Sequence, residues 1–336
     1  MKKIVVPFST DIEKLSSGEK ITLPPFAAKT QKHLSFTCDI SDIGEGKITV
    51  GHGYEVSGAS WVEITADEIK AFAYYTYTDP KCRSLFAEPI KHGLKVRDFV
   101  SVVIDVNPHE RGAFLIVSTS SGMIKTEMNG WDGNDGEIFA QVDGISAENC
   151  KLNWFSDGFS HRIWILGDSY CGFGHPARWP YYLYRDGYNN HFISGFPGMP
   201  AESAIEQFRR FVDRGAPEFV VWTLGMNNED KDGKMSESYL RSTEEFIAIC
   251  LERGITPILS TIPNVPGRDN SKKNEWVRSQ PYRYIDFARA VGSEKTPEWY
   301  PGMLSADMVH PSDKGAEALY MQVLCDFPEI MQRSNT

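Results

Sequence analysis

The pattern of hydrophobic and polar positions changes near residue 150. Before that point, short runs rich in β-branched and aromatic residues alternate with turns that contain Gly, Asn and Asp. Short strands at such spacing are typical of an antiparallel β-sandwich or jelly roll. The runs expected to be strands are residues 33–38, 47–50, 60–64, 70–77, 99–106, 113–118 and 137–142. Residues 1–155 are therefore predicted to form an all-β, jelly-roll-like sandwich domain.

The rest of the chain, residues 156–336, alternates strand-like runs with segments of helical period. The strand-like runs are residues 162–166, 191–194, 219–224, 256–262 and 283–287. Between them, apolar residues recur every three to four positions, as on the buried face of a helix. They are Ala204, Ile205, Phe208, Phe211 and Val212, then Tyr239, Phe246 and Cys250, and finally Ala316, Leu319, Tyr320, Val323, Leu324 and Phe327. Gly254 can end the second of these helices and Ser312 can cap the third. The alternation predicts a parallel sheet with helices on both faces.

Composition narrows the possible partners. The 336 residues are 41% hydrophobic and 24% charged, as in a soluble globular protein. The net charge of −10 argues against nucleic acid and anionic membrane surfaces as partners. No apolar run is long enough to span a bilayer. Composition leaves the oligomeric state open.

The N-terminus and the cysteines bear on the compartment. The apolar stretch at residues 4–8 is too short for a signal peptide. We therefore expect a cytoplasmic protein as the sequence stands, or a periplasmic or secreted one from which a signal peptide has been removed. The six cysteines lack Cys-x-x-Cys spacing, which favours buried free thiols over a disulfide framework. No clustered metal-ligand spacing is present, so neither a metal nor a cofactor is expected.

Candidate chemistry begins where the first strand-like run of the second part ends. Gly167-Asp168-Ser169 directly follows residues 162–166. Ligands of an open parallel sheet bind at the carboxyl ends of its strands, so Ser169 is a candidate nucleophile. A serine hydroxyl needs an adjacent general base. His310 is the natural base, because Asp307 lies three residues before it and can hold its imidazole in the required tautomer.

An acyl transfer also needs donors for the developing oxyanion. The side-chain amide of Asn227 and the backbone N–H groups of Gly198 and Ser169 can supply three. Gly198 and Asn227 follow the second and third strand-like runs, at the same expected sheet edge. A glycine at position 198 also lets the backbone approach a ligand without a Cβ in the way.

These motifs, in this order, resemble the SGNH hydrolases, also called the GDSL esterase/lipase family. Gly167-Asp168-Ser169 matches the first block of the family, Gly198 the second, with Gly195 as the alternative. Gly225-Met226-Asn227 matches the third block, and Asp307 with His310 matches the fifth. Two positions depart from the pattern: Asn228 stands where aspartate is usual, and Tyr170 where leucine is usual.

The resemblance covers about residues 160–330. It implies a three-layer α/β/α flavodoxin-like domain and serine-dependent ester hydrolysis without a metal. An all-β domain ahead of such a domain is similar in layout to some carbohydrate esterases that remove acetyl groups. The expected substrate is therefore a small acyl ester, most simply acetyl on a carbohydrate. The segment after Ser169 is rich in Trp and Tyr, whose flat rings suit sugars.

Other functions remain open at this stage. A thioester or a lipid ester requires the same catalytic residues, so a thioesterase or a lipase is an alternative. A sugar-binding protein built on an inactive hydrolase scaffold is another. An α/β-hydrolase is disfavoured, because no Gly-x-Ser-x-Gly elbow surrounds the serine.

Overall fold

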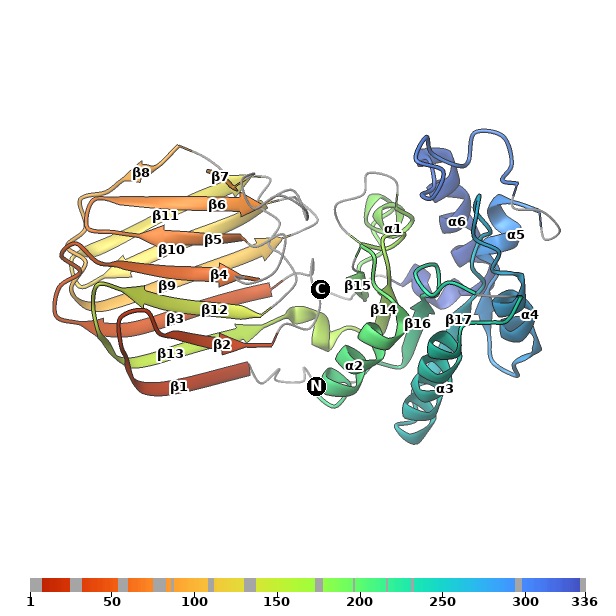
Figure 1. Cartoon of the computed structure of the whole chain (residues 1–336), viewed down its shortest axis with the longest axis horizontal. Helices are drawn as coiled ribbons and strands as arrows, with labels where there is room; N and C mark the ends of the chain where they lie inside the picture. The colour runs from red at the N-terminus through yellow and green to blue at the C-terminus, as the bar shows by residue number, and fades with distance from the viewer. Residues whose placement is uncertain are drawn as a thin grey trace. The chain divides into compact units, whose positions relative to one another are not determined.

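The computed structural model describes residues 8–24, 32–53, 60–74, 83–85, 88–107, 112–129, 137–172, 178–195, 197–215, 217–230, 233–293 and 298–332. The chain folds as two units, which divide between Asp157 and Gly158 (Figure 1). The sequence analysis put the domain boundary between residues 155 and 156.

The first unit contains two antiparallel sheets. One has the order β1 (Phe8–Leu15), β13 (Ala147–Phe155), β3 (Lys32–Ile40), β9 (Asp98–Asn107), β10 (Gly112–Thr119) and β11 (Gly122–Asn129). The other has the order β2 (Lys20–Leu23), β12 (Ile138–Asp143), β4 (Lys47–His52), β5 (Ser60–Ile64), β6 (Glu68–Tyr74) and β7 (Arg83–Leu85), and β8 (Ile90–Lys91) also pairs with β6.

Alternating side chains explain why these segments form strands. In β9 the buried residues are Val100, Val102, Ile104 and Val106, each separated by a more exposed position. This period of two places the β-branched side chains on one face of the sheet. The strand therefore has one face in the core of its unit and one face toward solvent.

The strands expected in the first part of the chain are found to within two residues at each end wherever the structure describes them. Residues 75–77 of the run at 70–77 lie outside the described residues. β1, β2, β7, β8, β11 and β13 were not predicted. The mixed α/β content and the antiparallel sheets are confirmed, whereas the jelly-roll-like sandwich arrangement stays a prediction.

The second unit is built on a parallel five-stranded sheet. Its strands are β14 (Ile163–Gly167), β15 (His191–Gly195), β16 (Phe219–Thr223), β17 (Thr256–Ser260) and β18 (Tyr284–Ile285). Their order, β15-β14-β16-β17-β18, places the second strand at the edge beside the first. This is the doubly wound order 2-1-3-4-5, in which ligands bind where the winding direction reverses.

Six α-helices connect and flank these strands. They are α1 (Pro180–Arg185), α2 (Ala201–Phe211), α3 (Glu237–Glu252), α4 (Ser271–Ser279), α5 (Phe287–Val291) and α6 (Asp313–Asp326), with 3₁₀ turns η1 (Asp157–Ser160) and η2 (Pro328–Met331). Because crossovers between parallel strands are right-handed, α1 lies on one face of the sheet and α2 and α3 on the other. Accordingly, α2 packs against α3, and α1 packs with α6 (Figure 1).

The predicted helix signals are observed. α2 buries Ala204, Ile205 and Phe208, as the helical period indicated. Gly254 adopts a φ of +67° after α3, and Ser312 Oγ accepts a hydrogen bond from the N–H of Gly315 at the start of α6. Both ends therefore follow the chemistry expected of helix caps.

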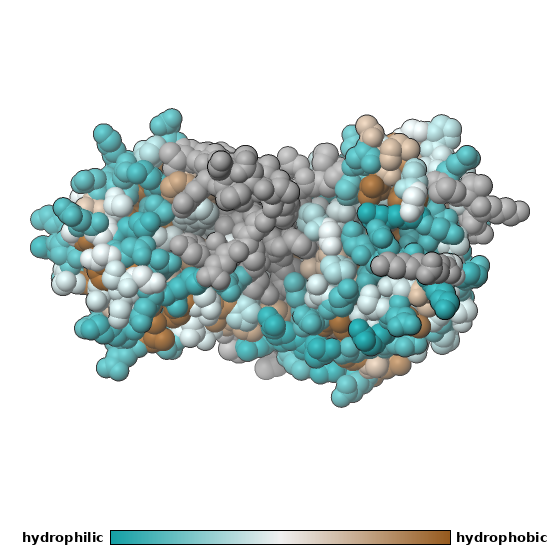
Figure 2. Space-filling model, viewed as in Figure 1, coloured by the Kyte–Doolittle hydropathy of each residue, from teal (hydrophilic) through white to brown (hydrophobic). Residues whose placement is uncertain are grey.

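The visible surface is mostly polar, and most of the described cysteines are buried. The visible face of both units is largely hydrophilic or intermediate in hydropathy (Figure 2). Of the cysteines that the structure describes, Cys38, Cys150, Cys171 and Cys250 are buried free thiols, and Cys325 is an exposed one. Among the described residues, no helix combines the length and the apolar character needed to cross a membrane.

Candidate active site

Ser169 lies in a tight turn at the carboxyl end of β14. The N–H groups of Cys171 and Gly172 both donate to the carbonyl of Asp168, at 3.0 and 2.8 Å, and the Tyr170 N–H donates to the Asp168 carboxylate at 3.0 Å. Gly167 precedes the turn, where a Cβ would collide with the side chains of Thr223 and Cys171. The turn therefore packs closely against the sheet and holds the serine in place.

His310 reaches this serine from the loop before α6. Its Nε2 lies 2.8 Å from Ser169 Oγ, and its Nδ1 lies 2.7 Å from Asp307 Oδ2. With the proton on Nδ1, the imidazole donates to the carboxylate and Nε2 accepts the serine hydroxyl. The structure thus brings together the three side chains that the sequence analysis selected as nucleophile, base and orienting carboxylate.

The Asp307 carboxylate is fixed by its own loop. Its Oδ1 accepts hydrogen bonds from the N–H groups of Val309 and His310 (both 2.9 Å) and from Ser305 Oγ (2.7 Å). Partial burial by itself raises the pKa of Asp307, but these hydrogen bonds and the one from the imidazole hold that pKa well below its ordinary value. The carboxylate therefore stays ionised and can stabilise a positive imidazole.

Tyr170 gives a second link between the two segments, which sequence reasoning missed. Its hydroxyl donates to the carbonyl of Val309 at 2.6 Å, and the side chain is only 5% exposed. Burial raises the pKa of Tyr170 well above its ordinary value, so the hydroxyl remains a donor. Leucine, the usual residue of the family here, has no such donor. Only knowledge of the distant Val309 carbonyl could have revealed this role.

Cys171 has a packing role, as expected from its position beside the site. Its side chain is fully buried, and its Sγ lies 2.9 Å from Thr223 Oγ1. Burial raises the pKa of the Cys171 thiol well above its ordinary value. Because only a thiolate is a strong nucleophile, this cysteine is unsuited to attack a carbonyl.

The loops after β15 and β16 carry the two other candidate oxyanion donors. Gly198 has a φ of +78°, a conformation that side-chain-bearing residues rarely adopt. The Asn227 amide donates to the carbonyl of Met199 at 3.2 Å, which joins the two loops. Both loops begin at the strand ends that flank Ser169, because Gly167 is in register with Gly195 and Thr223.

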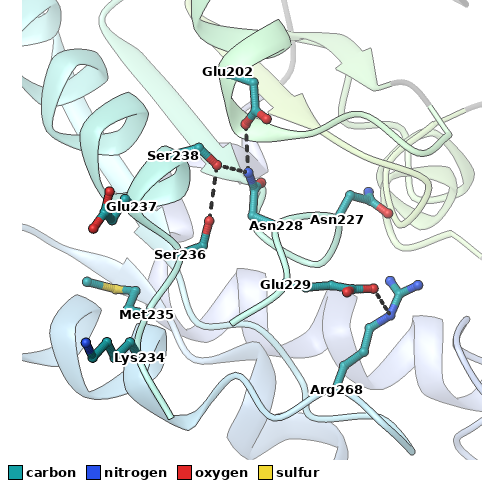
Figure 3. Close-up of a pocket in the computed structure, with 10 residues that line it drawn as sticks. All are labelled: Glu202, Asn227, Asn228, Glu229, Lys234, Met235, Ser236, Glu237, Ser238 and Arg268. Atoms are coloured by element: carbon teal, nitrogen blue, oxygen red, sulfur yellow. Dashed lines mark hydrogen bonds and ion pairs between the residues drawn. The ribbon is translucent and has the colours of Figure 1, made fainter. Parts of the chain in front are cut away.

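Asn228 joins the loop after β16 to the first turns of α2 and α3 (Figure 3). Its Oδ1 accepts the N–H of Ala201 at 2.9 Å, and its Nδ2 donates to Glu202 Oε2 at 2.7 Å and to Ser238 Oγ at 2.9 Å. An ionised aspartate would have no hydrogen to donate and would face the Glu202 carboxylate. The departure from the family's aspartate therefore matches a local partner that requires a donor.

The described aromatic residues after Ser169 divide between the core and the surface. Trp179 is completely buried, and Tyr182 stacks on Tyr320 while its hydroxyl donates to the carbonyl of Asp313. No aromatic residue lines the large cavity beside Asn227. Tyr181 is exposed, and a role of these rings in binding a sugar stays a prediction. The described residues also include no group of three or more His, Cys, Asp or Glu placed to hold a metal ion.

Comparison with known proteins places these features in context. No protein-family model and no curated protein sequence matches the chain. Three matching solved structures are a GDSL-like lipase from Bacteroides thetaiotaomicron (16% identity, TM-score 0.40), a lipase/acylhydrolase from Enterococcus faecalis (23%, 0.39) and a carbohydrate esterase family 3 protein from Talaromyces cellulolyticus (18%, 0.41). The matches cover 50%, 52% and 51% of this chain and 88%, 100% and 98% of theirs, respectively. The chain is thus similar to GDSL-type acylhydrolases, as its motifs indicate.

Burial of Asp168 predicts a specific pH dependence of stability. Burial raises the pKa of Asp168 from 3.8 to about 7, and the Tyr170 N–H and nearby Arg268 offset only part of this effect. Between these values the folded protein keeps a proton that the unfolded chain releases, so the free energy of unfolding falls as pH rises. In Asp168→Asn this contribution to the pH dependence is absent. The unfolding free energy of the variant, relative to that of the wild type, should therefore increase from pH 4.5 to pH 8. Urea unfolding of both proteins at pH 4.5 and pH 8 measures this difference. If stability changed equally with pH in the two proteins, the raised pKa of Asp168 would be contradicted.

Asn228 gives a second stability prediction. Asn228→Asp replaces two donated hydrogen bonds by a pair of facing carboxylates with Glu202. We expect a loss of about 1–3 kcal/mol of unfolding free energy at pH 8. The loss should shrink toward pH 5, because one carboxyl of such a pair readily takes up a proton. Thermal melts across this range test the effect, and Glu202→Gln in the same background should restore stability at pH 8. An equal loss at every pH would mean that the two groups do not interact.

Proposed function

We propose that the protein is a serine esterase that acts through Ser169, His310 and Asp307. The observation that carries the proposal is the unbroken hydrogen-bonded chain from Ser169 Oγ through both imidazole nitrogens to Asp307 Oδ2, at 2.8 and 2.7 Å. The raised pKa of the Cys171 thiol keeps that thiol neutral, and the lowered pKa of Asp307 keeps its carboxylate ionised. Both states support the same assignment of roles.

The reaction follows from the positions of these groups. Ser169 Oγ attacks the ester carbonyl while its proton passes to His310 Nε2, and Asp307 stabilises the resulting imidazolium. The tetrahedral intermediate collapses when His310 returns that proton to the departing alcohol, which leaves an acyl-serine. Water, deprotonated by the same nitrogen, then attacks the acyl carbon and releases the acid and the free serine.

The backbone N–H groups of Ser169 and Gly198 and the Asn227 amide are the proposed oxyanion donors. The strand topology supports this proposal. The three donors follow three adjacent strands, and these strands end in register at one edge of the sheet. Donors fixed by the fold need no reorganisation when the negative charge develops on the carbonyl oxygen.

Residues 156–336 are the proposed catalytic domain. The proposed substrate of this domain is a small acyl ester of a carbohydrate, most simply an acetate. Among the matched structures is one named as a carbohydrate esterase. A thioester or lipid ester remains the competing substrate. Rates on acetyl, butyryl and octanoyl esters of one chromophore separate them, since a tenfold preference for octanoyl would indicate an acyl-chain pocket.

The nucleophile can be tested directly. A fluorophosphonate probe should label Ser169 stoichiometrically, and Ser169→Ala should abolish labelling. His310→Ala should lower kcat by about three or more orders of magnitude, and Asp307→Asn by no more than that. Mass spectrometry of the labelled peptide and initial rates on a chromogenic acetate measure these outcomes. Labelling at Cys171 that survives Ser169→Ala would refute the assignment.

The oxyanion role of Asn227 makes a separate prediction. Asn227→Ala should lower kcat by about 10²–10³ with little change in KM, because the hydrogen bond matters mostly in the transition state. Asn228→Ala is the comparison variant and should lower stability more than kcat, since the Asn228 amide bonds to Glu202 and Ser238 (Figure 3). If Asn228→Ala had the larger effect on kcat, the motif alignment would be displaced by one residue.

A further inference from the structure

A cavity of about 610 Å³ opens beside the loop that carries Asn227 (Figure 3). Its walls come from the start of α2, the loop after β16, the segment that leads into α3, and the loop before α4. The lining residues are Glu202, Asn227, Asn228, Glu229, Lys234, Met235, Ser236, Glu237, Ser238 and Arg268.

The cavity adjoins the loop that carries one proposed oxyanion donor. Asn227, a proposed oxyanion donor, forms part of its wall. Arg268, which also lines the cavity, donates to the carbonyl of Met226 at 3.1 Å and so holds the residue that precedes Asn227. A molecule in the cavity would therefore contact the loop that carries this proposed donor.

The walls are suited to hydroxyl groups. Their side chains are amides, hydroxyls, carboxylates, an ammonium and a guanidinium, and the one apolar residue is Met235. A hydroxyl can donate to a carboxylate and accept from a cation or an amide at the same time. An acyl hydrocarbon would instead strip water from these groups without replacing their hydrogen bonds. The lining favours the alcohol part of an ester over its acyl chain.

The charges of the lining further restrict that alcohol. The lining residues that the structure describes include three glutamates, one lysine and one arginine. Arg268 lies 4.0 Å from Glu229. The lining thus has a formal charge of −1, and its guanidinium already has a carboxylate neighbour. A polyanionic alcohol would meet net repulsion, whereas a neutral sugar would not.

One wall of the cavity is held by a buried ion pair. Lys273 Nζ lies 2.8 Å from Asp230 Oδ1 and also donates to Asn270, and its side chain is fully buried. Asp230 in turn accepts the N–H of Ser236, the residue that caps α3. Breaking a buried pair of this kind is costly, so Asp230 gives Ser236, at the start of α3, a fixed partner.

We infer that this cavity binds the leaving alcohol of the substrate and that this alcohol is a neutral, polyhydroxylated molecule of the sugar class. The inference rests on the proposed esterase function for the reaction, but the binding itself is independent of catalysis. Lys234, Glu237 and Glu229 supply charged groups of the proposed site, and Met235 supplies an apolar one.

Direct binding is the first test. Calorimetry with the Ser169→Ala variant and a neutral xylo-oligosaccharide should give saturable binding, and Met235→Trp in that background should weaken it by at least about tenfold by filling the cavity. A galacturonate oligomer of the same length should bind more weakly than the neutral sugar. Absence of sugar binding, or tighter binding of the anionic oligomer, would overturn the inference.

Kinetics supply the second test. Lys234→Ala and Glu237→Gln should each lower kcat/KM for an acetylated xylo-oligosaccharide by about tenfold, while 4-nitrophenyl acetate is hydrolysed within about twofold of the wild-type rate. The matched controls are Lys272→Ala on α4 and Glu244→Gln on α3, exposed charges that do not line the cavity. Equal losses on both esters would also contradict the inference.

The two proposals fail in distinguishable ways. If the wild type hydrolyses neither ester while Ser169→Ala still binds the sugar and Met235→Trp prevents it, the esterase function is wrong and the binding site stands. If 4-nitrophenyl acetate is hydrolysed through Ser169 but the sugar does not bind, the esterase function stands and the alcohol site is wrong.

Discussion

The register of three neighbouring strands underlies the whole candidate site. Gly167 at the end of β14 pairs with Gly195 of β15 and Thr223 of β16, so the three loops that follow begin side by side. A Cβ on Gly195 would collide with the backbone of the turn that contains Cys171 and Gly172. Because Gly167 and Gly195 have no Cβ, the turn that contains Ser169 can pack directly against the ends of these two strands. A shift of one residue in either pairing would move Ser169 by about 3.3 Å relative to the loop that follows that neighbouring strand.

Much of the second unit could be predicted from the sequence, because its signals are local. Strand β14 is a continuous apolar run, α2 shows its buried face at helical spacing, and Ser312 caps α6. The pairing of His310 with Asp307 is also local, since three residues separate them. The contact between His310 and Ser169 spans 141 residues, and it could be predicted only because the carboxyl ends of parallel strands share one edge.

The remainder depends on polar partners that are distant in sequence. Helix α4 was not predicted, because the residues it buries include Lys273 and Asn274, which break the apolar period. Lys273 is buried against Asp230, and the Asn274 amide bonds to both backbone groups of Ile262. In the first unit, β11 escaped prediction because most of its side chains are exposed or half-buried, so no strong apolar alternation marks it. In each case the stabilising partner or the lack of burial becomes visible only in three dimensions.

Two consecutive residues of the serine turn bind two consecutive residues of the histidine loop. Ser169 bonds to the imidazole of His310, and Tyr170 bonds to the carbonyl of Val309. The first bond must break in the proposed reaction, because the acyl group replaces the proton on the serine oxygen. The second involves no reacting atom and persists through the acyl-enzyme. The tyrosine bond therefore still joins the serine turn to the histidine loop at the proposed step in which the acyl group occupies the serine oxygen. A leucine at position 170 would have no hydroxyl and could not form this link.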